Sequence, residues 1–239
     1  NRAITDEISA YNIAEYLINH QSKIKPNTKS YYSSIRKQWI FVKLLVKKRV
    51  QLLNQLESIV YTANTEVLIY CKHSTPNWLL LVLKQYPTAK RLAKANVFSL
   101  VKIPFVSREK AEILIAKAKL SISSSNDQTT ETIIKATVGQ ILQLAKVIAY
   151  HEKLMSESCN IPEVKILESF NGIGAYSAVG LLLEIGAVER FASSKKLASF
   201  FGLHPTLKNS GDGRAASRMS KKGRREPRVI LFNIARTSI

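Results

Sequence analysis

The chain has 239 residues, of which 46% are apolar and 22% charged, the proportions of a globular protein rather than a disordered one. Its longest uninterrupted apolar run, residues 78–83, is far shorter than the roughly 18 to 20 residues that span a membrane. Two cysteines and four histidines are scattered without metal-ligand spacing, which argues against a zinc or disulfide framework. With no basic-then-apolar leader at its start, the chain is expected in a reducing, cytoplasmic setting.

The charge of the chain is strongly positive and unevenly distributed. Thirty-six Lys and Arg against 17 Asp and Glu give a net charge of +19. Residues 31–60 and 91–120 each carry +5, residues 121–200 are close to neutral, and residues 201–239 hold nine basic and two acidic side chains. This excess predicts a polyanionic partner, namely nucleic acid. An anionic membrane surface is the alternative, which the lack of a Trp/Leu face in the basic C-terminal stretch disfavours.

Two helices are predicted near the N-terminus. Residues 4–18 form the first, with Thr5 as its N-cap and Asp6 in its first turn. After a break at Pro26, residues 28–63 form a long amphipathic helix, because their apolar side chains recur at steps of three and four. The basic faces of this helix are either the solvated side of a bundle or a surface along a phosphate backbone.

Short helices and then a second long helix are predicted for the middle of the chain. Residues 76–121 contain several short helices separated at prolines, and Ser107 caps the second of two helices around a tight turn. Residues 121–130 are polar and form the best linker candidate. Residues 131–156 repeat apolar side chains at heptad-like spacing. Because strand alternation is scarce, the predicted fold class is mainly α.

A glycine-containing turn at residues 167–178 is the most specific local signal. Gly172, Ile173 and Gly174 join two short predicted helices in the pattern of a helix-hairpin-helix. Both glycines permit positive φ and close backbone approach, and the following helix N-terminus offers N–H groups to a phosphate. Such contacts position a protein on nucleic acid without reading sequence. The alternative is a plain turn between two helices with a glycine cap.

The most basic segment, residues 208–228, contains eight basic and two acidic residues. Ser210 lies in its Asn-Ser-Gly-Asp-Gly loop, where it is either a turn residue or a nucleophile that needs a base or metal for activation. Clustered cations around an oxyanion are what phosphoryl transfer requires. The candidate DNA-binding residues of the segment are Lys208, Arg214, Arg218, Lys221, Lys222, Arg224, Arg225 and Arg228.

A possible metal-binding pattern opens the chain. Two carboxylates three residues apart would share a helix face and could hold Mg²⁺ together. Here Asp6 is followed by Ser9, a neutral oxygen, at that spacing. One carboxylate is a poor metal site, so the bare pattern indicates a capped helix start.

These pieces, in this order, resemble the insertion-sequence 110/116/902 transposases, the family that includes the Piv DNA invertase. The resemblance is strongest at residues 2–16 and 167–228. Within the second stretch it is carried by residues 185–205, by Ser210-Gly-Asp-Gly and by Met219-Ser-Lys-Lys-Gly.

The resemblance implies a three-part architecture and a catalytic site. An N-terminal RuvC-like α/β domain with an Asp-Glu-Asp-Asp site for Mg²⁺ would precede a long helical, coiled-coil-like connector and an α-helical transposase domain. Ser210 would be the nucleophile and Asp6 the third acidic ligand, with Ser9 at the position of the fourth. The first two acidic ligands would lie upstream of Asn1, so we expect only the C-terminal end of a truncated RuvC-like domain in this chain.

The resemblance also implies domain boundaries and partners. The expected parts are residues 1–63, the RuvC-like remnant with the long helix; residues 64–120, a helical middle segment; residues 121–160, the linker and connector helix; and residues 161–239, the transposase domain. The expected partners are DNA, a noncoding guide RNA and further copies of the chain, as a dimer or tetramer, and no membrane is expected. The expected location is the bacterial cytoplasm, in association with the nucleoid.

The predicted function is that of a DNA transposase or recombinase of an insertion sequence, which cleaves and rejoins strands through Ser210 with help from Mg²⁺-binding carboxylates and a structured RNA. The alternative is a catalytically defective or truncated relative that acts only as a nucleic-acid-binding module. Ser9 in place of an acidic residue motivates this alternative.

Overall fold

The computed structural model describes residues 5–21, 32–72, 74–159, 161–206 and 218–238, which are mainly helical as predicted. The chain divides into two compact units, residues 1–34 and 35–239. The first unit contains α1 (Asp6–Asn19), and the Oγ of its N-cap, Thr5, accepts a hydrogen bond from the Ile8 amide at 3.3 Å. The predicted first helix and its cap are therefore confirmed.

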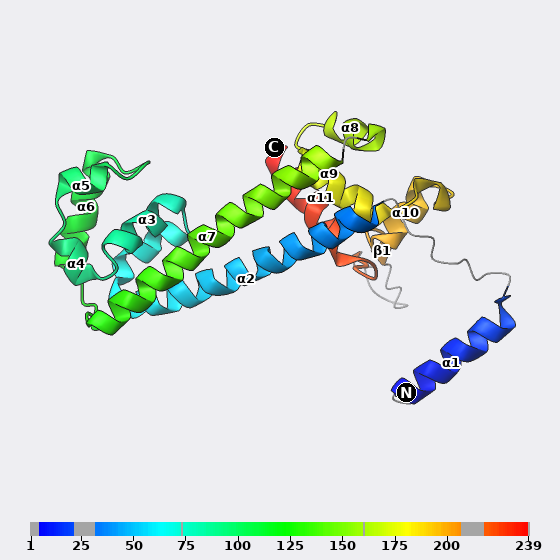
Figure 1. The fold of residues 1–239 in the computed structure, drawn as a ribbon, viewed down its shortest axis with the longest axis horizontal. Helices are drawn as coiled ribbons and strands as arrows, with labels where there is room; N and C mark the ends of the chain where they lie inside the picture. Colours follow the sequence, from blue (N-terminus) through cyan, green and yellow to red (C-terminus); the bar gives the residue numbers. More distant parts are fainter. Residues whose placement is uncertain (1–4, 22–31, 73, 160, 207–217, 239) are drawn as a thin grey trace, which may run out of the picture. The chain divides into compact units, whose positions relative to one another are not determined.

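The second unit is built from helices and one short antiparallel pair of strands (Figure 1). The elements in chain order are α2 (Ser33–Ala63), the 3₁₀ helix η2 (Thr65–Cys71), α3 (Asn77–Gln85), α4 (Ala89–Ala93), α5 (Val97–Val101), α6 (Arg108–Lys119), α7 (Gln128–Ser158), α8 (Pro162–Glu168), α9 (Ala175–Ile185), the 3₁₀ helix η3 (Val188–Arg190), α10 (Ser194–Phe200), β1 (Pro205–Thr206), β2 (Arg218–Met219) and α11 (Arg225–Thr237).

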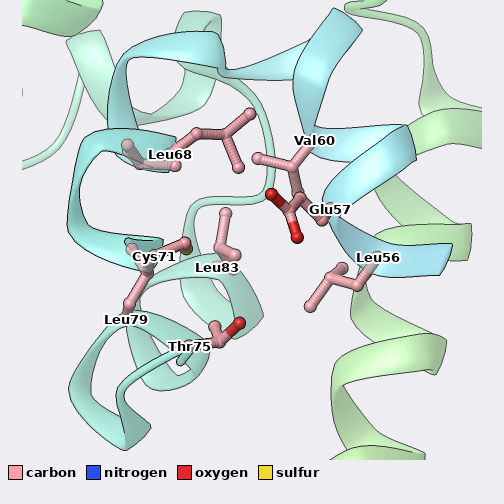
Figure 2. A pocket seen from close by; sticks show the side chains of 9 residues that line it. Leu56, Glu57, Val60, Leu68, Cys71, Thr75, Leu79 and Leu83 are labelled. Carbon is pink, nitrogen blue, oxygen red and sulfur yellow. The ribbon is translucent and has the colours of Figure 1, made fainter. Parts of the chain in front are cut away.

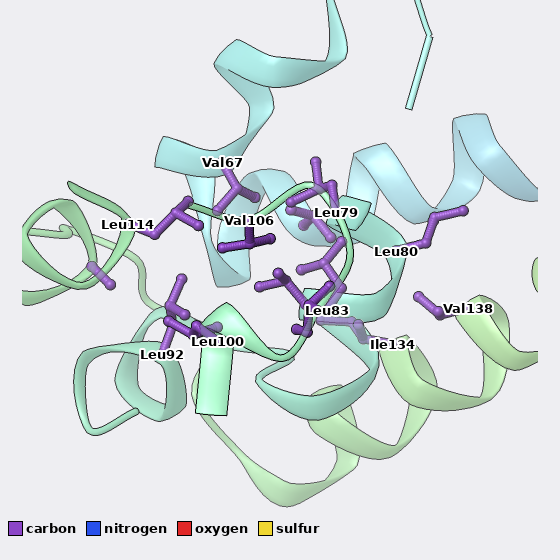
Figure 3. Close-up of a cluster of buried hydrophobic side chains, with 14 of the residues drawn as sticks. Val67, Leu79, Leu80, Leu83, Leu92, Leu100, Val106, Leu114, Ile134 and Val138 are labelled. Atoms are coloured by element: carbon purple, nitrogen blue, oxygen red, sulfur yellow. The ribbon is translucent and has the colours of Figure 1, made fainter. Parts of the chain in front are cut away.

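The main hydrophobic core lies where the C-terminal half of α2 and the N-terminal half of α7 meet the short helices α3 to α6. Figure 3 shows Leu83, Leu100 and Leu114 converging with Ile134 of α7. All four side chains are almost completely buried, which stabilises the fold by about 1.5–3 kcal/mol each. The amphipathic periodicity seen in the sequence of the long helices thus serves this core.

A small cavity borders this core beside η2 (Figure 2). Its volume of about 10 Å³ leaves room for the centre of a single water molecule and excludes a substrate. Burial raises the pKa of the Cys71 thiol that lines it, which disfavours the thiolate. The cavity therefore reflects imperfect packing rather than a site.

The connection before α7 is shorter than predicted. α7 begins at Gln128 rather than residue 131, because the Asp127 carboxylate caps the helix by accepting from the Thr130 amide at 2.9 Å. Ser121 Oγ donates to Glu66 Oε2 at 2.6 Å, and the Ser125 amide donates to the Thr62 carbonyl at 3.2 Å. This polar stretch is thus tied to α2 and η2 by hydrogen bonds.

Among the described residues, one helix is long and apolar enough to cross a membrane by length and composition, namely α7. Its Ile134, Val138 and Ile141 side chains are buried in the core, and a single helix of this kind is only a weak indication of a span. The expected lack of a membrane partner stays a prediction.

The N-terminal half of α2 packs against the C-terminal helices. The rings of Trp39 on α2 and Tyr176 on α9 lie 4.9 Å apart, and a Cβ atom at Gly180 would lie 2.4 Å from the Trp39 ring. Arg36 donates to the Leu183 carbonyl at the end of α9, and Lys43 pairs with Glu226 of α11 at 3.0 Å. Gly180 is therefore required for the contact between α2 and α9.

We expect opposite effects from the same substitution at two helical glycines. Gly180→Ala forces the rigid Trp39 ring to move and should lower the free energy of unfolding by about 1–3 kcal/mol. Gly139→Ala on α7, where an added Cβ meets no atom within 4 Å, should raise it by up to about 1 kcal/mol through helix propensity. Urea unfolding of both variants measures the difference, and an unchanged Gly180→Ala variant would contradict the packing described here.

Candidate nucleic-acid interface

The turn between α8 and α9 contains the two glycines that the sequence analysis singled out. The Phe170 amide donates to the Leu167 carbonyl at 3.2 Å, and the Ile173 amide donates to the Phe170 carbonyl at 3.1 Å. Gly172 adopts a φ of +84°, a region that favours glycine. Gly174 is the N-cap of α9 with a φ of −86°, so the expectation of a positive φ fits Gly172 alone.

Gly172 is covered by the end of α11. A Cβ atom at this position would lie 2.0 Å from Ser238 Oγ, and that hydroxyl donates to the Asn171 carbonyl at 3.0 Å. The glycine is thus needed for contact within the chain. An added Cβ at Gly174 meets no atom within 4 Å, so the start of α9 is accessible, as are the exposed Phe170 and Asn171.

A short pair of strands follows α10. Pro205 pairs with Met219 and Thr206 with Arg218 in antiparallel register, and Thr206 Oγ1 donates to the Arg218 carbonyl at 2.9 Å. The predicted nucleophile Ser210 and the predicted DNA-binding residues Lys208 and Arg214 lie outside the described residues. In the sequence they lie between the two paired strands.

The basic segment after β2 is held by backbone contacts with the turn after α10. The Lys221 amide donates to the Gly202 carbonyl at 3.0 Å, and Lys221 itself adopts a φ of +54°. A Cβ atom at Gly223 would lie 2.5 Å from the Phe200 carbonyl oxygen. Because the backbone of this segment is fixed, the exposed Lys221 and Lys222 side chains extend from a defined position.

Two of the predicted DNA-binding arginines make contacts within the chain. Arg224 Nη1 lies 3.0 Å from Glu184 Oε2 of α9, whose side chain is 10% exposed. Arg228 Nη1 donates to the carbonyl oxygens of Phe201 at 2.7 Å, Gly223 at 3.1 Å and Arg224 at 3.1 Å. Both guanidinium groups thus help to attach α11 and the basic segment to α9 and α10.

The remaining described candidates face solvent. Arg218, Lys221, Lys222 and Arg225 are all exposed and come from β2, the basic segment and the first residue of α11. Sequence reasoning missed Glu184, the partner of Arg224, and Arg190, whose guanidinium lies 4.6 Å from the ring centres of both Phe191 and Phe200. Glu184 and Arg224 come from distant segments, so sequence spacing carries no signal for their pairing.

Comparison with known proteins identifies the region that holds this surface. The family model described as Transposase IS116/IS110/IS902 family matches residues 164–239, from α8 through α11. The chain is 28% identical over 87 residues to the transposase for insertion sequence element IS1111A of Coxiella burnetii. It is 26% identical over 170 residues to the insertion element IS110 uncharacterized 43.6 kDa protein of Streptomyces coelicolor.

The chain is similar to the IS116/IS110/IS902 transposase family over residues 164–239. The similarity to the Coxiella relative covers 36% of this chain and 24% of the relative, and that to the Streptomyces relative covers 67% and 40%. The chain therefore spans less than half the length of these curated relatives.

The described residues of the chain do not fit the expected Mg²⁺ site. Asp6 is exposed in the first turn of α1, and Ser9 follows one turn later. Together they supply one carboxylate and one hydroxyl, and across the described ranges no group of three His, Cys, Asp or Glu could hold a metal ion. Because Mg²⁺ favours several oxygen ligands that include carboxylates, this pair is insufficient by itself.

The contacts of the arginines in the transposase region predict separable effects of two substitutions. Arg228→Ala removes three hydrogen bonds to carbonyl oxygens and should lower the free energy of unfolding by about 2 kcal/mol. Arg225→Ala, at an exposed position, should change it by less than about 0.5 kcal/mol. Thermal and urea unfolding compare the two variants, and equal stabilities would contradict the inward role of Arg228.

Proposed function

We propose that this chain acts in the transposition of an insertion sequence and binds DNA through the exposed basic residues of its C-terminal region. The observation that carries the proposal is the coincidence of two features. The transposase family match, residues 164–239, falls on the region that holds Lys221, Lys222 and Arg225 at the surface.

The proposed contact is electrostatic and independent of base sequence. Lysine and arginine side chains that neutralise phosphates release condensed counterions, so the affinity falls steeply with salt. Arg218, Lys221, Lys222 and Arg225 are available for this contact, since Arg224 and Arg228 are engaged by Glu184 and by backbone carbonyls. The basic segment thereby divides into residues that stabilise the domain and residues that bind DNA.

Strand cleavage is assigned to Ser210. In the proposed transesterification, Ser210 Oγ forms an ester bond with the scissile phosphorus and loses its proton, while the bond from phosphorus to a deoxyribose oxygen breaks and that oxygen takes up a proton. The phosphoserine ester is retained until a second deoxyribose hydroxyl attacks it and rejoins the strand. No step of this proposal is assigned to Mg²⁺, because Asp6 and Ser9 do not make a sufficient site.

The covalent ester is the testable feature of this mechanism. The protein encoded by the whole reading frame, incubated with duplex DNA carrying the ends of its insertion sequence, should give a protein–DNA adduct that survives SDS. Ser210→Ala should abolish the adduct, whereas Ser220→Ala, a neighbouring serine outside the proposed chemistry, should retain it. Gel electrophoresis with labelled DNA measures both.

Binding without any adduct in the unmodified protein would favour the alternative, a nucleic-acid-binding relative that has lost catalysis. An adduct of undiminished yield in the Ser210→Ala variant would assign the nucleophile to another residue.

A structured guide RNA and a dimer or tetramer also belong to this proposal, through the family resemblance. Strand exchange requires two duplexes to be held together, which a dimer or tetramer accomplishes. The bacterial cytoplasm and its nucleoid are the corresponding location. Co-purification of RNA with the full-length protein, and its mass in solution, test these two partners directly.

A further inference from the structure

Two helical turns in the second unit share one backbone arrangement. The turn between α5 and α6 has the same hydrogen bonds as the turn between α8 and α9, displaced by 67 residues. The Ile103 amide donates to the Leu100 carbonyl at 2.9 Å, as Phe170 does to Leu167 at 3.2 Å. The following bonds, Val106 to Ile103 at 3.2 Å and Ile173 to Phe170 at 3.1 Å, also correspond.

The equivalence extends to conformation and burial. Phe105 has a φ of +66° at the position of Gly172, whose φ is +84°. Ser107 and Gly174 are the N-caps of α6 and α9, and Ala111 and Ala178 are fully buried one turn later. The chain therefore contains two hairpins with one backbone arrangement. The sequence conceals this repeat because Phe105 stands at the position that Gly172 holds in the other hairpin.

The two hairpins differ in what covers their tips. Ser238 of α11 lies over Gly172, whereas Phe105 is 86% exposed. Figure 3 shows that the inner side of the α5–α6 hairpin is attached to the core through Leu100, Val106 and Leu114. The α5–α6 hairpin thus has a firmly anchored inner face and an exposed tip.

The two hairpins also differ in charge. Residues 161–178, around the α8–α9 turn, contain one lysine and two glutamates, while the equivalent residues 94–111 contain four basic residues and one glutamate. Lys102 and Arg108 are exposed on either side of the α5–α6 tip. Arg108 Nε lies 3.1 Å from Glu112 Oε1, but both side chains are more than half exposed, so this pair is weak and can exchange for a phosphate.

We propose that the α5–α6 hairpin is a second DNA-contacting element of this chain, which binds the sugar–phosphate backbone of duplex DNA through Lys102 and Arg108. This inference rests on the proposed function. It depends on the side-chain charges and not on the start of α6, since the Ser107 hydroxyl already accepts from the Lys110 amide there at 3.2 Å.

The proposed partner is a duplex. Lys102 and Arg108 are exposed on either side of the tip, and phosphate contacts by exposed cations suit the regular backbone of a duplex. Single-strand sites combine cations with aromatic rings on which bases stack, and the Phe105 ring at the tip is exposed, so the test below compares both forms of DNA.

A pair of matched double variants tests this proposal in the full-length protein. Lys102→Ala/Arg108→Ala removes the two proposed contacts. Lys146→Ala/Lys153→Ala removes the same charge from exposed positions on α7, where Lys153 pairs with Glu157 at 3.7 Å as Arg108 pairs with Glu112. Fluorescence anisotropy with a labelled 30-base-pair duplex and with a single strand of the same sequence, from 0.05 to 0.3 M salt, gives the affinities, and thermal unfolding confirms that both variants are folded.

We expect the Lys102→Ala/Arg108→Ala variant to bind the duplex about tenfold or more weakly at 0.1 M salt, with a log–log salt slope reduced by about 2. The α7 variant should retain the unmodified protein's affinity within about threefold. Equal losses in both variants, no loss in the hairpin variant, or a loss confined to the single-stranded probe would each overturn the inference. If the unmodified protein binds DNA in these cases, the proposed function is retained. If the unmodified protein does not bind DNA, the proposed function itself is rejected.

Discussion

The close contact between Trp39 and Gly180 is the constraint on which the arrangement of the second unit depends. It lets the Trp39 ring of α2 pack directly against the backbone of α9, and it lies beside the Arg36 bond to the end of α9 and the ion pair of Lys43 with Glu226. α9 in turn packs against α7, α8 and α11. Because Gly180 has no Cβ atom, α2 can contact α9, and α9 in turn joins the long helices to the helices within residues 164–239.

Buried contacts decide which cations remain for nucleic acid. The attachment of α11 uses Arg224, which pairs with the buried Glu184, and Arg228, which donates to the Phe201 carbonyl in a partly buried position. A lysine ammonium group lacks the planar fork of hydrogen-bond donors that a guanidinium has, so it is less suited to bind several carbonyl oxygens at once. Lys221 and Lys222 accordingly remain at the surface.

The paired hairpins show how one backbone arrangement can serve two different purposes. Where glycine occupies the left-handed position, another helix approaches closely and covers the turn, as α11 does at Gly172. Where phenylalanine occupies it, the tip stays exposed and its surroundings carry the positive charge. The two closely spaced glycines of the α8–α9 hairpin can be recognised in the sequence. The solvent exposure of the α5–α6 hairpin cannot.

The sequence by itself determined the mainly helical fold, the caps at Thr5 and Ser107, the end of the first long helix at Ala63 and the similarity to a transposase family. These features depend on neighbouring residues or on local motifs, so they can be recognised along the chain. The start of α7 was misplaced because the polar composition after residue 121 outweighed the capping signal of Asp127. Only the tertiary structure decided which arginines point inward, why Gly180 is required and which hairpin is exposed. Each of these depends on atoms brought together from distant segments, such as Glu184 with Arg224 and Trp39 with Gly180.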